Sequence, residues 1–103
     1  MSLVDKQDKF AGMVSLLVAY MRFKGYQVTY GDAYRDDRVT YGHPKSTHRS
    51  RLAVDLNLFK DGKYLADGEA HEHFHDFWDL IGGAERIDKD LNHYSHSEYQ
   101  GVR

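Results

Sequence analysis

The central strand of the predicted fold is Leu52-Ala53-Val54-Asp55-Leu56-Asn57-Leu58-Phe59. Apolar residues alternate in it with small or polar ones, which is typical of a β-strand with one buried face. The alternation assigns two sets of side chains to opposite faces: Leu52, Val54, Leu56 and Leu58, and Ala53, Asp55 and Asn57. We expect the leucine-rich face to be buried and the other face to be accessible. Asp55 is therefore predicted to lie on a rigid strand, where its side chain can act as a fixed ligand.

The segments on either side of this strand predict its partners in a small antiparallel sheet. Asp61-Gly62 fits a two-residue hairpin turn that leads into a strand at Lys63-Tyr64-Leu65. Residues 26–30 are rich in aromatic and β-branched side chains and are predicted to form another strand. A short strand is expected at about residues 92–96. The polar segment 32–47 is predicted to be a long loop, and long ordered loops often carry function.

A first helix is predicted over about residues 5–24, because apolar side chains recur there at helical spacing. We expect Asp5 to cap its start and Gly25 to end it in the left-handed conformation. The apolar run at residues 11–21 resembles the core of a signal peptide. However, acidic residues precede this run and no small-residue cleavage site follows it, so no signal peptide is expected.

A second helix is predicted from about Glu69 to Ile81, with Asp67 as its cap and Gly82-Gly83 at its end. Its predicted buried stripe consists of Phe74, Phe77, Trp78 and Ile81. His71 and His75 share one face of this helix, as a metal-binding pair would, but the sequence offers them no obvious third ligand. We therefore expect a solvated, histidine-rich start of the helix. Metal binding by the cluster His71, His73 and His75 remains an alternative.

Length and composition predict one domain over residues 1–103, and the expected helices and strands give it an α+β fold, a small antiparallel sheet flanked by two main helices. The 103 residues give a core near the lower limit of independent folding, and 41% hydrophobic and 29% charged residues are typical of globular proteins. Without cysteine, the chain can form neither disulfides nor thiolate zinc sites. A net charge of -2 and scattered basic residues argue against a nucleic-acid partner. No stretch is long enough to span a bilayer, so stable membrane insertion is not expected, and the oligomeric state is left open.

A split set of polar residues predicts a catalytic metal centre. Two neutral imidazoles and one carboxylate can hold Zn²⁺ and leave a fourth position for water. His48, Asp55 and His93 are the candidate ligands. Asp90, three residues before His93, is the candidate general base, because a turn would let both side chains reach one site.

Two further candidates lie in the polar segment before the long strand. Arg35, at the end of a strand-like region at residues 30–34, could place a cation next to a carbonyl that gains negative charge. Ser46 could hydrogen-bond a substrate group or orient the loop that carries the first histidine ligand. Both residues also have purely structural alternatives: Arg35 can pair with Asp36 or Asp37, and Ser46 can cap a turn.

These motifs recur in the same order in a known family. The first half is Ser46-x-His48 followed by Leu52–Phe59, and the second half runs from Phe77-Trp78 to Gly82-Gly83, Asp90–Ser95 and Gly101-Val102-Arg103. Together they resemble the zinc D-alanyl-D-alanine carboxypeptidase family, the VanY-like peptidases, from about Gly25 to the end of the chain. The closest branch is that of phage endolysins acting as L-alanyl-D-glutamate endopeptidases. As departures, many relatives have glycine where Arg51 or Leu52 falls, and Tyr94 stands where phenylalanine is common.

The resemblance implies a role for each candidate residue. His48, Asp55 and His93 match the zinc ligands, and Asp90 matches the acidic general base of the endopeptidase branch. Arg35 matches an arginine that stabilises the substrate carbonyl. Ser46 matches the serine ahead of the first ligand. The implied fold is that of the hedgehog and D-Ala-D-Ala peptidases.

The implied function is zinc-dependent hydrolysis of the stem peptides of peptidoglycan by a phage or prophage endolysin, at the L-alanyl-D-glutamate bond. Such a protein would remain in the host cytoplasm until lysis and act at the bacterial cell wall after release. Two alternatives stay open: a D,D-carboxypeptidase or dipeptidase of the same fold, and a non-catalytic zinc-stabilised binding domain. A metal-dependent nuclease is less favoured, since the chain has no basic stripe for a phosphate backbone.

Overall fold

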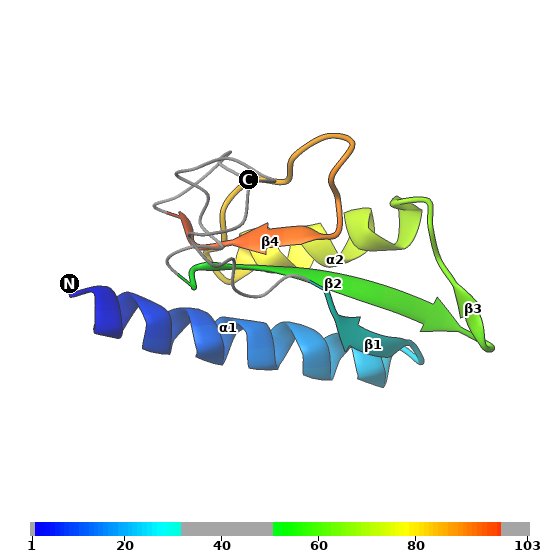
Figure 1. The fold of residues 1–103 in the computed structure, drawn as a ribbon, viewed down its shortest axis with the longest axis horizontal. Helices are drawn as coiled ribbons and strands as arrows, with labels where there is room; N and C mark the ends of the chain where they lie inside the picture. Colours follow the sequence, from blue (N-terminus) through cyan, green and yellow to red (C-terminus); the bar gives the residue numbers. More distant parts are fainter. Residues whose placement is uncertain (1, 32–50, 98–103) are drawn as a thin grey trace, which may run out of the picture.

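The computed structural model describes residues 2–31 and 51–97, which form an α+β fold of two helices and a small antiparallel sheet (Figure 1). Its elements follow the predicted order: α1 (Leu3–Phe23), β1 (Gln27–Tyr30), β2 (Ala53–Lys60), β3 (Lys63–Tyr64), α2 (Glu69–Leu80) and β4 (His93–Ser95). The predicted class of fold is therefore confirmed for the described residues. Arg35, Ser46 and His48 lie outside them, as does the predicted loop at residues 32–47.

β2 is the central strand, and every other strand pairs with it in antiparallel orientation. β1 pairs with β2 from Gln27↔Phe59 to Tyr30↔Leu56. β4 pairs with the first three residues of β2, and β3 pairs with the last two. The turn between β2 and β3 has positive φ at both central residues, Asp61 (53°) and Gly62 (79°), as a type I′ hairpin turn requires. The predicted hairpin is confirmed.

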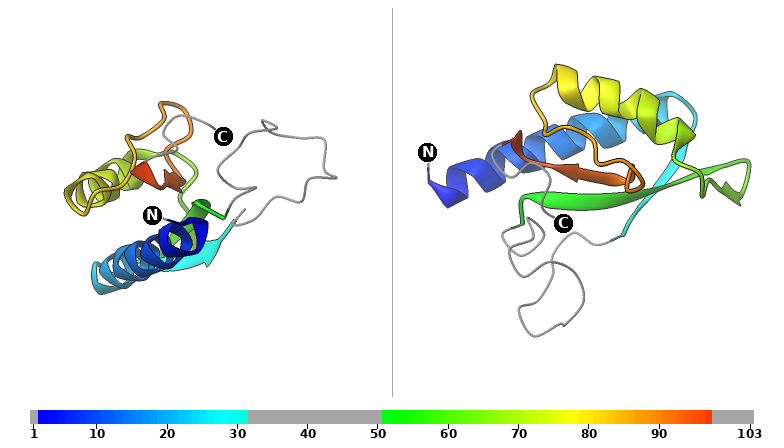
Figure 2. Two further views of the ribbon diagram at one scale, coloured as in Figure 1. Left: turned by 90° about the vertical axis from the view of Figure 1, so that its left-hand side faces the viewer. Right: turned by 90° about the horizontal axis from the view of Figure 1, so that it is seen from above.

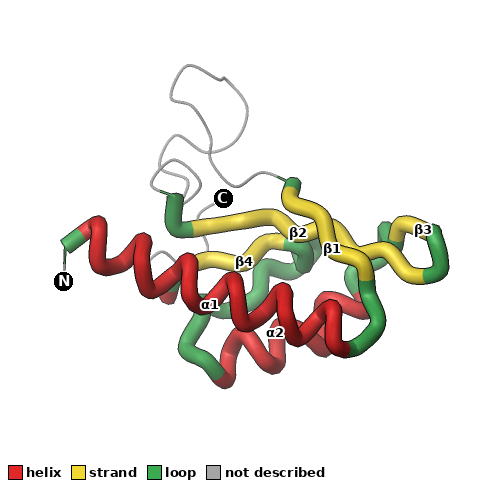
Figure 3. Tube along the Cα trace, turned by 90° about the horizontal axis from the view of Figure 1, so that it is seen from below, coloured by secondary structure: helices red, strands yellow, loops and turns green. Residues whose placement is uncertain are grey.

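Both helices cover one face of the sheet (Figure 2), where they also pack against each other (Figure 3). The leucine-rich face of β2 points toward them, as predicted. The buried core cluster contains residues from both helices, β2 and β4: Phe10, Met13, Val14, Leu17, Met21, Leu52, Val54, Leu56, Leu58, Phe74, Trp78 and Tyr94. The side chains that alternate with the leucines of β2 therefore lie on the opposite face of the sheet.

α1 begins two residues earlier than expected, and its cap is Ser2 rather than Asp5. The Ser2 hydroxyl accepts a hydrogen bond from the Asp5 backbone N–H (3.1 Å), and the Asp5 carboxylate accepts one from the Ser2 backbone N–H (3.3 Å). This reciprocal capping box explains why the acidic residue lies inside the first turn. At the other end Gly25 has φ of 96°, as predicted. No helix among the described residues is long and apolar enough to cross a membrane.

The cap residue of α2 is Gly68. Asp67, one position earlier, accepts a hydrogen bond from the Glu69 N–H through its carboxylate (3.3 Å). Its buried stripe differs from the prediction. Phe74 and Trp78 are buried as expected, whereas Phe77 and Ile81 are only partly buried. The other buried positions belong to His71 and His75, which are 4% and 0% exposed. The expectation of a solvated histidine-rich start is therefore wrong for these two residues, while His73 is exposed.

Two glycines give a matched test of this packing. A methyl group at Gly83 would overlap the indole ring of Trp78, whereas one at Gly12, in α1, would meet no atom within 4 Å. We expect Gly83→Ala to lower the free energy of unfolding by at least ~2 kcal/mol, and Gly12→Ala to raise it by up to ~1 kcal/mol. Urea unfolding checks both values. Equal stability of the two variants would contradict the packing of Gly83 on Trp78.

Candidate metal centre

Asp55 and His93 meet at the centre of the sheet. They are register partners on β2 and β4, so both side chains project from the same face of the sheet, opposite the helices. His93 Nδ1 lies 3.2 Å from Asp55 Oδ1, and the two residues are 2% and 7% exposed. The structure thus brings together two of the three predicted zinc ligands, which lie 38 positions apart along the chain.

Asp55 is buried, which contradicts the prediction that its face of β2 is accessible. One reason is that the side chain of its register partner His93 lies on the same face, with Nδ1 3.2 Å from Asp55 Oδ1. His93 lies on one edge of the strand, and on the other the Gly31 N–H donates to the Asp55 carbonyl oxygen (2.8 Å). A Cβ at Gly31 would lie 3.2 Å from the Asp55 Cβ, so glycine permits this close approach. Sequence alternation assigned the correct face but could not predict its burial.

Asp90 lies in the turn that leads into β4. The His93 N–H donates to the Asp90 carbonyl oxygen (3.1 Å), and the Asp90 N–H donates to the carbonyl oxygen of Ile87 (3.0 Å). Asp90 is half-buried and lines a pocket of about 300 Å³ together with His71 and Asn92. The candidate base and the candidate ligand His93 are therefore held at the two ends of one short turn.

The donor pair fits a zinc site in its chemistry and spacing. Two ligand atoms bonded to a tetrahedral zinc ion at about 2.0–2.1 Å lie roughly 3.3 Å apart. The 3.2 Å between His93 Nδ1 and Asp55 Oδ1 is close to this value, and it also suits a hydrogen bond between them. Within residues 2–31 and 51–97, no group of three or more acidic or histidine residues is arranged to hold a metal ion. A complete centre therefore requires a ligand from outside these ranges, where His48 lies.

Behind this pair, three side chains of α2 make polar contacts with residues 91–95. The contacts are His71 Nδ1 with the Tyr94 hydroxyl (2.8 Å), His75 Nε2 with the Leu91 carbonyl oxygen (2.7 Å) and Trp78 Nε1 with the Ser95 carbonyl oxygen (3.0 Å). Sequence reasoning missed these supports for β4. The signal was present, because His71 and His75 occupy the same helical face as Phe74 and Trp78.

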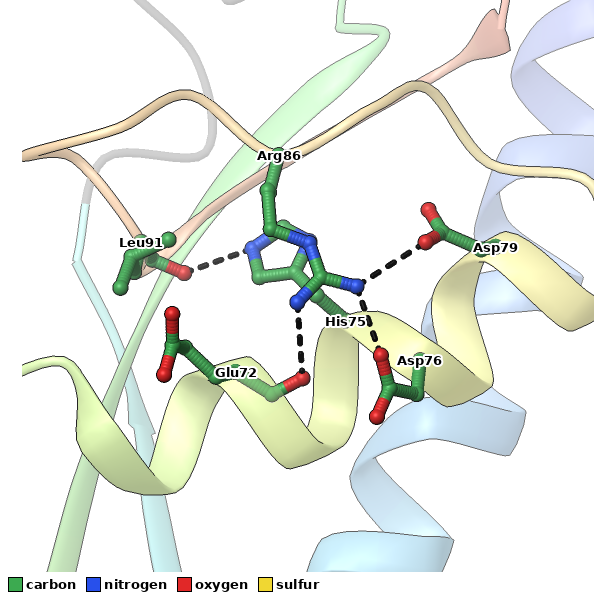
Figure 4. A network of polar contacts seen from close by, with 6 residues as sticks. All are labelled: Glu72, His75, Asp76, Asp79, Arg86 and Leu91. Atoms are coloured by element: carbon green, nitrogen blue, oxygen red, sulfur yellow. Dashed lines mark hydrogen bonds and ion pairs between the residues drawn. The ribbon is translucent and has the colours of Figure 1, made fainter.

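Arg86, in the segment between α2 and β4, attaches this segment to α2 through polar contacts with exposed residues of the helix (Figure 4). Its guanidinium group donates to Asp76 Oδ1 (2.7 Å), Asp79 Oδ2 (3.0 Å) and the Glu72 carbonyl oxygen (3.3 Å). The hydrogen bond from Arg86 lowers the pKa of the Asp76 carboxyl group. These contacts are largely exposed, so they orient the segment more than they stabilise the fold.

Burial shifts the pKa values of His71, His75 and Tyr94, which lie behind the candidate centre. Burial, with a smaller contribution from neighbouring His75 in the case of His71, lowers the pKa of both His71 and His75 from 6.5 to about 4. Burial also raises the pKa of the Tyr94 hydroxyl. All three groups are therefore neutral at pH 7, and the helix contacts of β4 are hydrogen bonds between neutral groups.

These buried histidines predict a loss of stability in mild acid. In the unfolded chain His71 and His75 become protonated below about pH 6.5. In the folded protein they become protonated only at about pH 4. Lowering the pH from 7 to 5 should therefore reduce the free energy of unfolding by roughly 2 kcal/mol for each histidine. Urea unfolding of metal-free protein at both pH values measures the change. The loss of unfolding free energy between pH 7 and pH 5 should be smaller in His75→Gln by the contribution of this histidine. It should be unchanged in His73→Gln. An equal dependence in all three proteins would contradict the assignment.

No family model matches the chain, and no curated protein matches it either. We therefore infer a function from the geometry of Asp55, His93 and Asp90 and from the motifs that these residues belong to.

Proposed function

We propose that the chain is a zinc-dependent peptidase that hydrolyses the stem peptides of peptidoglycan, at the L-alanyl-D-glutamate bond, as a phage or prophage endolysin. The observation that carries the proposal is the buried pair of Asp55 and His93, whose donor atoms lie 3.2 Å apart on adjacent strands. Asp90 stands one turn before His93, in the order found in the family that the chain resembles. A hedgehog-like and D-Ala-D-Ala peptidase-like fold is part of the same proposal.

Each candidate residue has a defined task in this reaction. His48, Asp55 and His93 would hold the Zn²⁺ ion. When bound, zinc supplies a Lewis acid and lowers the pKa of a water molecule to about 7. The Asp90 carboxylate accepts the proton of the attacking water and donates it to the leaving amine.

The two remaining residues act on the substrate. The Arg35 guanidinium group stabilises the negative charge that develops on the substrate carbonyl oxygen. Ser46 hydrogen-bonds a substrate group close to the first ligand. Both residues lie outside the described part of the chain, so their roles rest on the resemblance.

Two further observations support the proposal. The candidate base Asp90 lines a pocket of about 300 Å³, the size of a small ligand subsite, although Asp55 and His93 are not among its lining residues. Arg51 has φ of 60°, a left-handed conformation that favours glycine, and glycine is common at or next to this position in the VanY-like peptidases.

The partner and place of action follow from the proposed chemistry. The substrate is a peptide of the cell wall, and the protein would act there after release from the host cytoplasm at lysis. The same site would serve a D,D-carboxypeptidase if the cleaved bond were the terminal one. A zinc-stabilised binding domain would keep the metal and hydrolyse nothing.

The proposal is tested by following the release of free amino groups from purified muropeptides. We expect hydrolysis by the zinc-loaded protein, its loss on chelation, and its return when zinc but not magnesium is added. Hydrolysis that persists in excess chelator would overturn the zinc mechanism. Zinc binding without any hydrolysis would favour the binding-domain alternative.

A further inference from the structure

Three consecutive carbonyl groups in the turn between Asp90 and His93 accept hydrogen bonds. The donors are the His93 N–H for Asp90 O (3.1 Å), His75 Nε2 for Leu91 O (2.7 Å) and the Leu56 N–H for Asn92 O (2.9 Å). The carbonyl groups of Asp90 and Asn92 thus accept hydrogen bonds from backbone N–H groups of β4 and β2. The middle carbonyl receives its hydrogen bond from a side chain of α2 (Figure 4). His75 therefore fixes the centre of the turn that carries the candidate base and one candidate ligand.

The Leu91 side chain is held as well. It packs against Gly68 at the start of α2, where a Cβ would lie 2.6 Å from Leu91 Cδ1. A residue with a side chain at position 68 would push Leu91 away from the helix. Both the carbonyl group and the side chain of Leu91 are thus set by contacts with α2.

The imidazole of His75 is not explained by packing alone. The ring is 0% exposed and stacks on Tyr94, with ring centroids 4.3 Å apart and an interplanar angle of 13°. Since a carbonyl oxygen only accepts, the hydrogen of the neutral ring must be on Nε2. No described residue hydrogen-bonds Nδ1, and burying such a nitrogen costs stability. A phenylalanine would fill the same space without this cost, so the feature specific to histidine here is the Nε2–H donor.

We propose that His75 is a positioning residue for the candidate metal centre. Its Nε2–H holds the Leu91 carbonyl group, so that the side chains of Asp90 and His93 keep their relative placement. The inference rests on the proposed function, because it assigns this placement to zinc binding and proton transfer. Groups that orient metal ligands through a second layer of contacts commonly affect metal affinity or activity by ~10–100-fold.

Two replacements separate the hydrogen bond from the packing. His75→Phe keeps a flat ring against Tyr94 but removes the donor, whereas His75→Gln keeps an N–H₂ donor at the reach of Nε2. We expect His75→Phe to fold, to bind zinc ~10–100-fold more weakly and to lose kcat by a similar factor, with KM changed less than about threefold. His75→Gln should recover most of both losses, and the exposed His73→Gln should behave as wild type.

The same proteins, studied free of metal by NMR, provide a readout that does not depend on activity. The imidazole ¹⁵N shifts of wild-type His75 should show the Nε2–H tautomer, and the backbone amide of Asn92 should shift in His75→Phe more than in His75→Gln. An Nδ1–H tautomer would overturn the inference. So would wild-type kcat and zinc affinity in His75→Phe, or equal impairment of the phenylalanine and glutamine variants.

The experiments distinguish a failure of the proposed function from a failure of the role proposed for His75. A wild-type protein that neither binds zinc nor hydrolyses peptide overturns both the proposed function and the role of the turn in it. Wild-type hydrolysis together with an unimpaired His75→Phe overturns the inference alone. If His75→Phe does not fold, His75→Gln and the tautomer of the wild-type ring still decide the question.

Discussion

His93→Gln is expected to abolish stoichiometric zinc binding. Glutamine keeps a polar side chain of similar length next to Asp55, so the buried carboxylate retains a hydrogen-bonding neighbour and the sheet should still form. It lacks the imidazole that zinc prefers as a ligand. Changes outside the ligand shell already reduce metal affinity by ~10–100-fold, so loss of a ligand should exceed 100-fold. Peptide hydrolysis should fall with the bound metal.

The effect is measured by zinc content after dialysis and by the rise in melting temperature on adding zinc. A metal that binds only the folded state stabilises it, so the wild-type protein should melt higher with zinc and His93→Gln should not. The exposed His73→Gln serves as the matched control. His48→Ala should likewise lose most of the zinc and some thermal stability. Full zinc content in His93→Gln would remove His93 from the ligand set.

Asp90→Asn is expected to separate metal binding from catalysis. The replacement preserves shape but cannot accept a proton, so kcat should fall by ~10²–10⁴-fold while zinc content stays at the wild-type level. The acidic limb of the pH–rate profile, which reports ionisation of the base, should also disappear from the residual activity. The assay is hydrolysis of purified muropeptides over a range of pH.

Asp88→Asn is the matched control for this second experiment, because Asp88 is exposed and lies two residues earlier in the same segment. It should retain wild-type rates. An Asp90→Asn variant that hydrolyses peptide as fast as Asp88→Asn would exclude Asp90 as the general base. Loss of zinc from Asp90→Asn would instead give Asp90 a role in holding the ligands.

The fold was predictable where a local pattern determines the structure. Alternation in Leu52–Phe59 identified the central strand and its buried face, and Asp61-Gly62 identified the hairpin. Burial on the second face was not predictable, because it involves His93, which strand pairing brings to Asp55 from a distant part of the chain. The start of α1 was misassigned because Asp5 is a good capping residue by itself, and the capping box with Ser2 was overlooked.

Part of the candidate site was also predictable from local patterns in the sequence. Spacing placed Asp90 near His93, and strand pairing then brought His93 to Asp55, as expected. The inward orientation of His71 and His75 was missed, since polar side chains at the start of a helix are usually solvated. Their burial depends on neutral partners, Tyr94 and the Leu91 carbonyl group, which no local pattern reveals.

Mass spectrometry of purified muropeptides after incubation with zinc-loaded protein distinguishes zinc-dependent endopeptidase activity from every alternative. We expect one new amino terminus, on the D-glutamate that follows L-alanine, and none with chelated protein or with Asp90→Asn. Release of the terminal D-alanine instead would keep the zinc chemistry and move it to a different bond. Intact muropeptides after incubation with fully zinc-loaded protein would exclude peptidoglycan hydrolysis as the function of this chain.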